Sequence, residues 1–473
     1  MKLPNQFEEM MIQQLGETEA KLLCHALSDT ESPTSIRINR NKISMYPDSA
    51  NIEDVVPWCK DGLYLKTRPS FTFDPLFHAG CYYVQEASSM FLQRVVDQYV
   101  NRPVTALDLC AAPGGKSTHL LSSLPAGSLL VSNELIPNRA SVLVENIVKW
   151  GYPNAVVTNN APSDFSPFEG LFDLIVTDVP CSGEGMFRKD PVAVSEWSEN
   201  NVETCWRRGR DILSDCWPSL KEGGYLVYST CTFNVKEDEE NVRWICNELG
   251  AEVLPVDTED AWGITGNLLP DEGDGMHFPV YHFLPGRTRG EGFFLVLLRK
   301  TSSSKSFVLR ADKKKKRTVL PSLPVPDECR RWLKEQSAFA WRILGNVVTA
   351  VPAEHMELVA FLEQHLRVLH AGVCVAEMKG HDVFPSPLLA SSLCLARDAF
   401  PQCELTYDEA LSYLRKESFP LSSEQPKGYV LLTFHCFPLG FVKNLGSRAN
   451  NLYPTEWRIR TTHLPDKMIS VLP

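Results

Sequence analysis

The sequence lacks the cysteine patterns that mark cross-linked or zinc-bound domains. It contains 14 cysteines in 473 residues, but no Cys-x-x-Cys pair and no Cys/His cluster at zinc spacing. A disulfide framework or a structural zinc site would need such spacing. We therefore expect reduced thiols, a cytoplasmic protein and no metal site.

Long apolar runs are also missing. The N-terminal residues MKLPNQFEEMMIQQLG are polar and acidic, whereas a signal peptide begins with basic residues followed by an apolar run. No stretch approaches the ~18 consecutive apolar residues of a membrane-spanning helix. The sequence predicts neither export nor a membrane partner.

An excess of positive charge, the usual mark of a nucleic-acid-binding protein, is absent from the chain as a whole. The 47 Lys and Arg are outnumbered by 58 Asp and Glu, giving a formal net charge of -11. Two segments differ: residues 302–317 hold seven basic residues and one acid, and residues 427–473 hold six basic residues and two acids. The negative charge is therefore unevenly distributed along the chain. The net charge limits the affinity for RNA but does not exclude RNA as a partner.

Length and pattern indicate several folded units. At about 100 to 200 residues per domain, this length predicts two to four domains. A helical pattern from Phe7 to Leu27 and an extended piece from Thr34 to Asn39 predict a small α/β module. From about Val104, apolar runs alternate with helical segments, as in a doubly wound parallel sheet. We expect an N-terminal module (1–100), the sheet domain (101–300), a basic linker (301–320), an intermediate subdomain (321–371) and a C-terminal domain with strand-like runs (372–473).

A glycine loop follows the first apolar run of the sheet domain. The sequence DLCAAPGGKSTHLL places Gly114 and Gly115 between a strand and a helix, where a nucleotide-type cofactor binds in parallel sheets. Glu134 stands 26 residues after Asp108, at the end of the next strand, where a carboxylate can accept hydrogen bonds from both ribose hydroxyls. The loop departs from G-x-G-x-x-G and from the P-loop, which disfavours dinucleotides and triphosphates. A tight turn without a ligand is the alternative.

Two cysteines follow neighbouring strands of the same sheet. Asp178, Pro180 and Cys181 leave one strand, and Cys231 leaves the next in the run GYLVYSTCT. Chemistry in α/β folds gathers at this rim, and a thiolate nucleophile must be partly exposed. The alternatives are a buried small hydrophobe for each Cys and a helix N-cap for Asp178.

At this point the chain resembles the Sun-type (Nol/Nop/Sun) RNA cytosine-5 methyltransferases, which use S-adenosylmethionine. The resemblance rests on YYVQEASSM, DLCAAPGGKS, TDVPCSGEGMFRKDP, YSTCT and GEGFFLVLLRK, in that order. FRKDP, the long C-terminal extension and FPLGFVKNLGSRANNLYP resemble the bacterial branch that methylates small-subunit ribosomal RNA. The implied fold is a doubly wound, Rossmann-like methyltransferase sheet with a small N-terminal α/β module and a mixed C-terminal region containing a PUA-like RNA-binding domain.

The resemblance also implies roles for individual residues. Glu134 would hold the ribose of the cofactor, Asp178 would contact the target base beside the cofactor, Cys231 would be the nucleophile, and Cys181 would assist release. The family has an acidic residue near the adenine where this chain has Ala161, so Asn159 or Asn160, or apolar and backbone contacts, would have to substitute. The loop around the methionine end of S-adenosylmethionine would consist of Cys110, Ala111, Ala112, Pro113, Gly114, Gly115 and Lys116.

The predicted function is therefore S-adenosylmethionine-dependent RNA cytosine-5 methylation, with ribosomal RNA as the expected partner. A tRNA methyltransferase and a non-catalytic RNA-binding assembly factor are the alternatives, and the intact Asp178, Cys181 and Cys231 argue against the latter. The sequence does not define the oligomeric state. Two further groups of residues are candidates for RNA recognition. Basic side chains that could contact RNA, or could simply be solvated, are Arg188, Lys189, Lys313 to Arg317, Lys443, Arg448, Arg458 and Arg460. Aromatic side chains that could stack on a base, or could simply pack in the core, are Phe187 and Tyr228.

Overall fold

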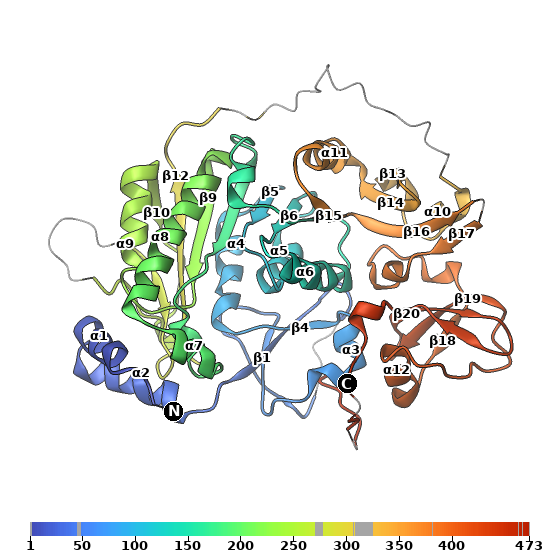
Figure 1. Ribbon diagram of the computed structural model, residues 1–473, viewed down its shortest axis with the longest axis horizontal. Coiled ribbons are helices and arrows are strands. Elements are labelled where there is room, and N and C mark those ends of the chain that lie inside the picture. Colours follow the sequence, from blue (N-terminus) through green and yellow to red (C-terminus); the bar gives the residue numbers. More distant parts are fainter. Residues whose placement is uncertain are drawn as a thin grey trace.

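Figure 1 shows the computed structural model of the chain. It describes residues 2–44, 49–269, 278–305, 307, 325–380, 382–461, 463–465 and 467–472. Residue 306 and residues 308–320 of the predicted basic linker, including Lys313 to Arg317, lie outside the described residues. Within the described ranges, no helix is long and apolar enough to cross a membrane.

The N-terminal module consists of two helices and a small antiparallel sheet. The continuous helical pattern from Phe7 to Leu27 is in fact two helices, because Gly16 adopts a φ of 79° between them. The sheet has the order β2-β3-β1-β4. The elements are α1 (Asn5–Leu15), α2 (Glu17–Asp29), β1 (Thr34–Ile38), β2 (Ile52–Val55), β3 (Gly62–Leu65), α3 (Pro75–His78) and β4 (Tyr82–Val84).

The centre of the molecule is a nine-stranded sheet with the order β10-β12-β9-β8-β5-β6-β7-β15, in which β11 also pairs with β12. Strands β7, β6, β5, β8 and β9 are parallel, and β10, β11, β12 and β15 are antiparallel to their neighbours. The predicted doubly wound sheet is thus confirmed. Its elements are α4 (Leu92–Tyr99), β5 (Thr105–Asp108), α5 (Gly115–Ser123), β6 (Leu129–Asn133), α6 (Pro137–Trp150), β7 (Ala155–Thr158), β8 (Phe172–Asp178), α7 (Pro191–Glu196), α8 (Glu199–Cys216), β9 (Leu220–Thr230), α9 (Glu239–Trp244), β10 (Ala251–Leu254), β11 (Tyr281–Phe283) and β12 (Phe293–Lys300).

Helices cover both faces of this sheet (Figure 1), which explains why its strands are continuous apolar runs. Successive strand residues point to opposite faces, so Ala106 of β5 belongs to one core and Leu107 to the other. The first core includes residues of α4, α5 and α6, and the second includes residues of α8, α9 and α11. The sheet is therefore a rigid support for the loops at its carboxyl edge.

The C-terminal region adds two four-stranded sheets, and also a strand to the central sheet. β15 pairs antiparallel with β7 and covers that edge, which the sequence pattern does not predict. The predicted boundary at residues 371/372 falls inside the first C-terminal sheet, because β13-β14-β16-β17 spans it. The second sheet has the order β18-β19-β20-β21 and shares a hydrophobic core with the N-terminal sheet. The elements are α10 (Asp327–Arg331), β13 (Phe339–Leu344), β14 (Val347–Pro352), α11 (Met356–His365), β15 (Val368–Ala371), β16 (Val373–Lys379), β17 (Asp382–Pro385), β18 (Gln402–Glu404), α12 (Tyr407–Leu414), β19 (Gly428–Phe434), β20 (Phe437–Asn444) and β21 (Ala449–Asn451).

Candidate active site

The carboxyl ends of three adjacent parallel strands bring the predicted site residues together. In the register, Asp108 of β5 lies beside Val176 of β8, and Asp178 of β8 lies beside Ser229 of β9. Cys231 follows the end of β9 by one residue. The glycine loop, Asp178 and both cysteines consequently share one edge of the sheet, as their positions after strands predict.

The glycine loop joins β5 to α5 through a backbone conformation that favours glycine. Gly114 has a φ of 116° and precedes the first helical residue, Gly115. A Cβ atom at Gly114 would approach Leu143 to 3.3 Å. Below the loop, the buried carboxylate of Asp108 accepts a hydrogen bond of 2.6 Å from the Ser117 hydroxyl. Burial raises the pKa of Asp108 from 3.8 to about 7.

A cavity of about 210 Å³ opens beside this loop. Its wall includes every residue of the predicted cofactor loop except Gly114, and also Asp178. Other lining residues come from β4 and from the segment that follows it, within the motif YYVQEASSM, to which the sequence pattern assigns no role of its own. These additional lining residues are Tyr83, Val84, Gln85, Glu86 and Ser89.

Glu134 lies at the end of β6 and is 4% exposed. Its carboxylate accepts a hydrogen bond of 2.9 Å from the Ile136 backbone N–H, and Arg139 lies 3.6 Å away. It does not line the 210 Å³ cavity, but it terminates the neighbouring strand. This is the position at which a strand-end carboxylate meets a ribose in parallel nucleotide-binding sheets.

Lys116 and Asp178 form an ion pair at the floor of the cavity. The Lys116 Nζ lies 2.8 Å from the Asp178 Oδ2, and the Ser229 hydroxyl donates to the Asp178 Oδ1 at 2.9 Å. The ammonium also stands 4.9 Å above the ring of Phe293. Burial alone would lower the pKa of Lys116, but the Asp178 carboxylate outweighs it and raises the pKa overall.

The two cysteines face each other. Their Sγ atoms are 3.0 Å apart, and the Cys231 backbone N–H donates to the Cys181 Sγ at 3.3 Å. Both side chains are half-buried and both thiols are free. The hydrogen bond to Cys231, together with burial, raises the pKa of Cys181 well above its ordinary value. The Cys181 sulfur is therefore a neutral thiol near neutral pH.

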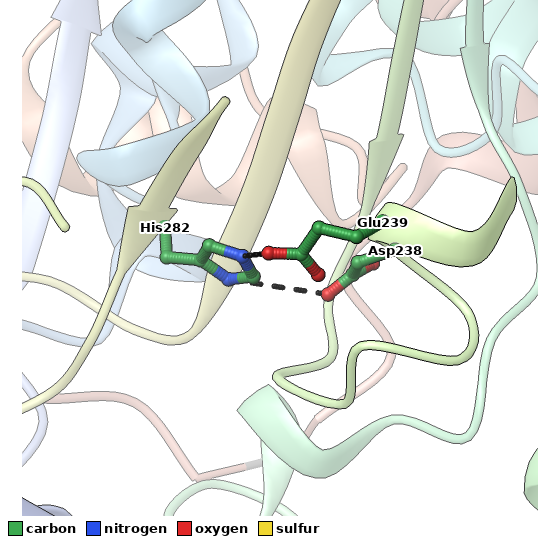
Figure 2. Close-up of side chains that lie close together, drawn as sticks. All are labelled: Asp238, Glu239 and His282. Carbon is green, nitrogen blue, oxygen red and sulfur yellow. Dashed lines mark hydrogen bonds and ion pairs between the residues drawn. The ribbon is translucent and has the colours of Figure 1, made fainter. Parts of the chain in front are cut away.

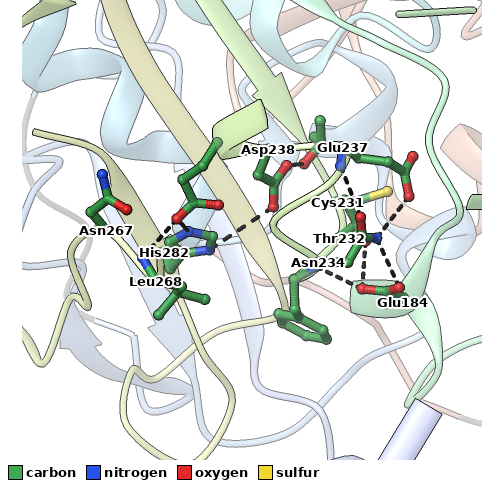
Figure 3. A network of polar contacts seen from close by, with 12 residues as sticks. Glu184, Cys231, Thr232, Asn234, Glu237, Asp238, Asn267, Leu268 and His282 are labelled. Carbon is green, nitrogen blue, oxygen red and sulfur yellow. Dashed lines mark hydrogen bonds and ion pairs between the residues drawn. The ribbon is translucent and has the colours of Figure 1, made fainter. Parts of the chain in front are cut away.

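Buried polar residues bind the two cysteine loops to each other (Figure 3). The carboxylate of Glu184, in the loop after Cys181, accepts hydrogen bonds from the Thr232 hydroxyl (2.5 Å), the Phe233 N–H (2.8 Å) and the Asn234 amide (2.9 Å). In return Glu237, after Cys231, accepts from the Ser182 N–H at 3.0 Å. Burial raises the pKa of Glu237 to about 7. The sequence reasoning missed these acids, although both lie within six residues of a cysteine motif.

Three side chains singled out for RNA or base contacts have structural partners instead. Arg188 donates to Glu291 at 3.0 Å and to the Gly290 carbonyl at 2.7 Å, which uses its guanidinium within the protein. Phe187 and Tyr228 are 0% exposed and belong to hydrophobic cores. Both aromatic residues therefore pack in the core, which is the alternative to base stacking.

The polar groups around Ala161 also form hydrogen bonds within the protein. The Asn159 amide donates to the Glu134 and Leu135 carbonyls, and Asn160 accepts from the Arg367 N–H at 3.0 Å. The exposed Asp164 accepts from the Ala161 N–H at 2.9 Å, which places a carboxylate at this corner. In the sequence, this carboxylate could have been found from the spacing, because an acid three residues after Ala161 can accept a hydrogen bond from the Ala161 N–H in a turn.

The fold and this edge define an α/β enzyme that holds a cofactor above parallel strands, beside two facing thiols. Residues 100–299 match the family model described as 16S rRNA methyltransferase RsmB/F. Residues 3–87 match the N-terminal domain of 16S rRNA methyltransferase RsmF, and residues 400–459 match the methyltransferase RsmF PUA domain. The chain belongs to the RsmB/F family and is an S-adenosylmethionine-dependent RNA methyltransferase of the Sun type.

Curated relatives span nearly the whole chain. The ribosomal RNA small subunit methyltransferase F of Salmonella agona is 31% identical over 457 residues, covering 89% of each chain, and that of Salmonella heidelberg is 31% identical over 458 residues with the same coverage. Among solved structures, a methyltransferase homolog protein from Pyrococcus horikoshii is 25% identical, with a TM-score of 0.52, covering 63% of this chain and 95% of that one. NSun6 from Pyrococcus horikoshii with SFG is 20% identical, with a TM-score of 0.51, covering 63% and 99%. That last likeness shows the fold alone.

Proposed function

We propose that this enzyme methylates carbon-5 of a cytosine in small-subunit ribosomal RNA, through a covalent adduct on Cys231. The observation that carries the proposal is the pair of free thiols, 3.0 Å apart, at the carboxyl edge that also holds Asp178 and the glycine loop. Two thiols in contact fit a reaction in which one sulfur adds to the base and the other assists its release. The sequence resemblance and the curated relatives supply the substrate class.

The residues around the cavity fit S-adenosylmethionine. The loop Cys110 to Lys116 would surround its methionine end, at the start of α5, where the N-cap residue Gly114 supplies no side-chain hydrogen bond to the N–H groups of the first turn. A Cβ atom at Gly115 would occupy space beside the Tyr83 ring, at 3.5 Å from it, and both of these residues line the cavity. Glu134 would accept from the ribose hydroxyls. When bound, the cofactor supplies an electrophilic methyl group.

Carbon-5 of cytosine is a weak nucleophile, so the base must first be activated. The Cys231 thiolate forms an S–C6 bond, which makes carbon-5 enamine-like and able to attack the methyl group. Asp178, oriented by Lys116 and Ser229, contacts the ring nitrogen and the exocyclic amine of the cytosine, and a proton shared between this carboxyl group and the ring nitrogen balances the negative charge that develops as sulfur adds. The target base must be unstacked from its RNA to reach this edge.

Release requires loss of the carbon-5 proton and cleavage of the S–C6 bond. Cys181 assists this step, directly or through a water molecule, because its sulfur is in contact with the Cys231 sulfur and its N–H. The raised pKa of Cys181 keeps it a neutral thiol, which can donate a hydrogen bond to the Cys231 sulfur as the S–C6 bond breaks. A water molecule beside Cys181 accepts the carbon-5 proton, the electrons of the breaking C5–H bond form the C5=C6 double bond, and the S–C6 electrons return to the Cys231 sulfur.

The RNA partner is proposed from the relatives and from the C-terminal region. Arg448, Arg458 and Arg460 are exposed, and the half-buried Lys443 lies 5.5 Å from the rings of Phe384 and Tyr429. This combination of cations and aromatic rings fits RNA contacts. A ribosomal RNA substrate also places the enzyme in the cytoplasm. The proposed division into residues 1–100, 101–300, 301–320, 321–371 and 372–473 follows the sequence pattern, and the sheet β13-β14-β16-β17 joins the last two of these units.

The test is bisulfite sequencing of total RNA from a strain that lacks the protein, complemented with variants. Wild type and Cys24→Ala, a control thiol on α2, should restore one methylated cytosine, and Cys231→Ala should not. Cys181→Ala should accumulate a covalent RNA–protein adduct. Full methylation by Cys231→Ala would show that the nucleophile is assigned wrongly. A restored site in tRNA would support the tRNA alternative, and no methylation by any variant would favour an RNA-binding assembly factor.

A further inference from the structure

A buried cluster of three ligand-type side chains lies behind the Cys231 loop. Asp238 immediately precedes α9, Glu239 is the first residue of that helix, and His282 projects from β11 toward both (Figure 2). All three are 0% exposed. No step of methyl transfer uses them, and the sequence shows no ligand spacing because His282 is 43 residues from Glu239.

The hydrogen bonds of the cluster leave one atom of each side chain free. Asp238 Oδ1 accepts from the Thr230 hydroxyl at 2.6 Å, and Glu239 Oε1 accepts from the Leu268 N–H at 2.8 Å. His282 Nε2 lies 2.9 Å from Glu239 Oε1. If Nε2 carries the proton, it donates to Glu239 and Nδ1 retains its lone pair. Among the residues that the structure describes, Asp238 Oδ2, Glu239 Oε2 and His282 Nδ1 have no hydrogen-bond partner.

The charges of the cluster are incompletely balanced. The ion pairs that Asp238 and Glu239 make within the described part of the chain are with the imidazole of His282. Buried carboxylates of this kind are stabilised either by protons or by a cation.

We propose that Asp238, Glu239 and His282 bind one divalent transition-metal ion. His282 Nδ1 and Asp238 Oδ2 are 4.0 Å apart, and two metal bonds of about 2.1 Å can span up to about 4.2 Å. Ligand atoms of all three residues lie within 4.8 Å of one another, so rotation of the Glu239 side chain completes the set. One imidazole nitrogen with two carboxylates suits Zn²⁺ or Mn²⁺ and disfavours Ca²⁺ and Mg²⁺, which select oxygen-rich shells.

The ion would stabilise the loop that carries Cys231, the proposed nucleophile. Thr230, whose hydroxyl donates a hydrogen bond to Asp238, immediately precedes Cys231 in the chain. The ion would fix Asp238 and hence the end of β9. The three residues are therefore positioning residues, and the proposal does not depend on which RNA is methylated.

Mn²⁺ is the probe of choice, because thiolates bind it weakly and this chain has 14 free cysteines. The full-length protein, stripped with a chelator, is dialysed against Mn²⁺, and bound ion is quantified by electron paramagnetic resonance. Wild type and His25→Gln, an exposed control histidine beside Asp29, should bind one ion per chain with the same affinity. Asp238→Asn and His282→Gln should weaken binding by ~10-fold or more.

Thermal unfolding supplies the second readout. Mn²⁺ should raise the melting temperature of wild type and His25→Gln but leave both cluster variants unchanged. If either variant fails to fold by circular dichroism, Glu239→Gln replaces it. Absence of Mn²⁺ binding by folded wild-type protein would show that protons alone neutralise the cluster and would overturn the proposal. Binding that persists equally in all variants would also overturn it, because the ion would then occupy another site.

Discussion

Replacement of Glu184 by Gln tests the hydrogen-bond network that joins the two cysteine loops. Glu184 receives four donors: Trp197 Nε1 and Asn234 Nδ2 reach Oε1, while the Thr232 hydroxyl and the Phe233 N–H reach Oε2. Gln has nearly the same shape but only one accepting oxygen. Its NH₂ group must therefore face a pair of donors in either orientation.

The cost follows from which donor loses its acceptor. With the NH₂ toward Thr232, the hydroxyl can rotate and accept, but the Phe233 N–H cannot. With the NH₂ toward Trp197, the indole N–H is left without an acceptor. An unsatisfied buried N–H costs about 1–3 kcal/mol. Glu184→Gln should therefore lower the free energy of unfolding by about 1–3 kcal/mol.

Urea denaturation followed by tryptophan fluorescence measures this loss, and Glu196→Gln is the matched control because Glu196 is exposed near the same loop. Methyl transfer should also fall, since the Cys181 loop would no longer be held against the Cys231 loop. Equal unfolding midpoints for Glu184→Gln, Glu196→Gln and wild type would refute the reasoning, and would mean that this carboxylate does not accept all four bonds.

Two further predictions concern the cofactor edge and the C-terminal region. Because burial raises the pKa of Asp108 from 3.8 to about 7, its contribution to stability is complete below about pH 4 and is lost as the pH rises through 7. The control is Asp108→Asn, in which Ser117 keeps a hydrogen-bond acceptor. The unfolding free energy of wild type minus that of the variant should fall by roughly 4 kcal/mol between pH 4 and pH 7. Denaturation titrations measure this difference, and a difference that does not change with pH would contradict the assignment. Replacing Arg448, Arg458 and Arg460 by Ala should weaken RNA binding and reduce the slope of log affinity against log salt by about 2, which filter binding across salt concentrations measures; an unchanged slope would place the RNA elsewhere.

The sequence predicted what local pattern determines. Apolar runs fixed the strands of the central sheet, and the residues that follow them met at one edge because parallel strands share their carboxyl ends. Asp178, Cys181 and Cys231 could be found in this way. Their roles stay predictions until the variants are measured.

Features that depend on long-range contacts could not be found. β15 joins β7 across more than 200 residues, and nothing in its four residues indicates that partner. Arg188 looked like a solvated or phosphate-binding loop charge, but Glu291 from the far end of the domain neutralises it. The Glu184 and His282 networks likewise join separate segments, so their residue types carry no local signal.

The net charge of -11 also changes its meaning once burial is known. Among the described residues, nine acids are buried against three bases, so buried groups account for six of the eleven net negative charges. These acids include Asp108, Glu184, Glu237, Asp238 and Glu239, which stabilise the core and the cysteine loops and do not repel RNA as a solvated surface charge would. Their fields are further reduced wherever a proton or a cation neutralises them. The surface that RNA meets is thus less acidic than the composition indicates, and exposed arginines in the C-terminal region can dominate it locally.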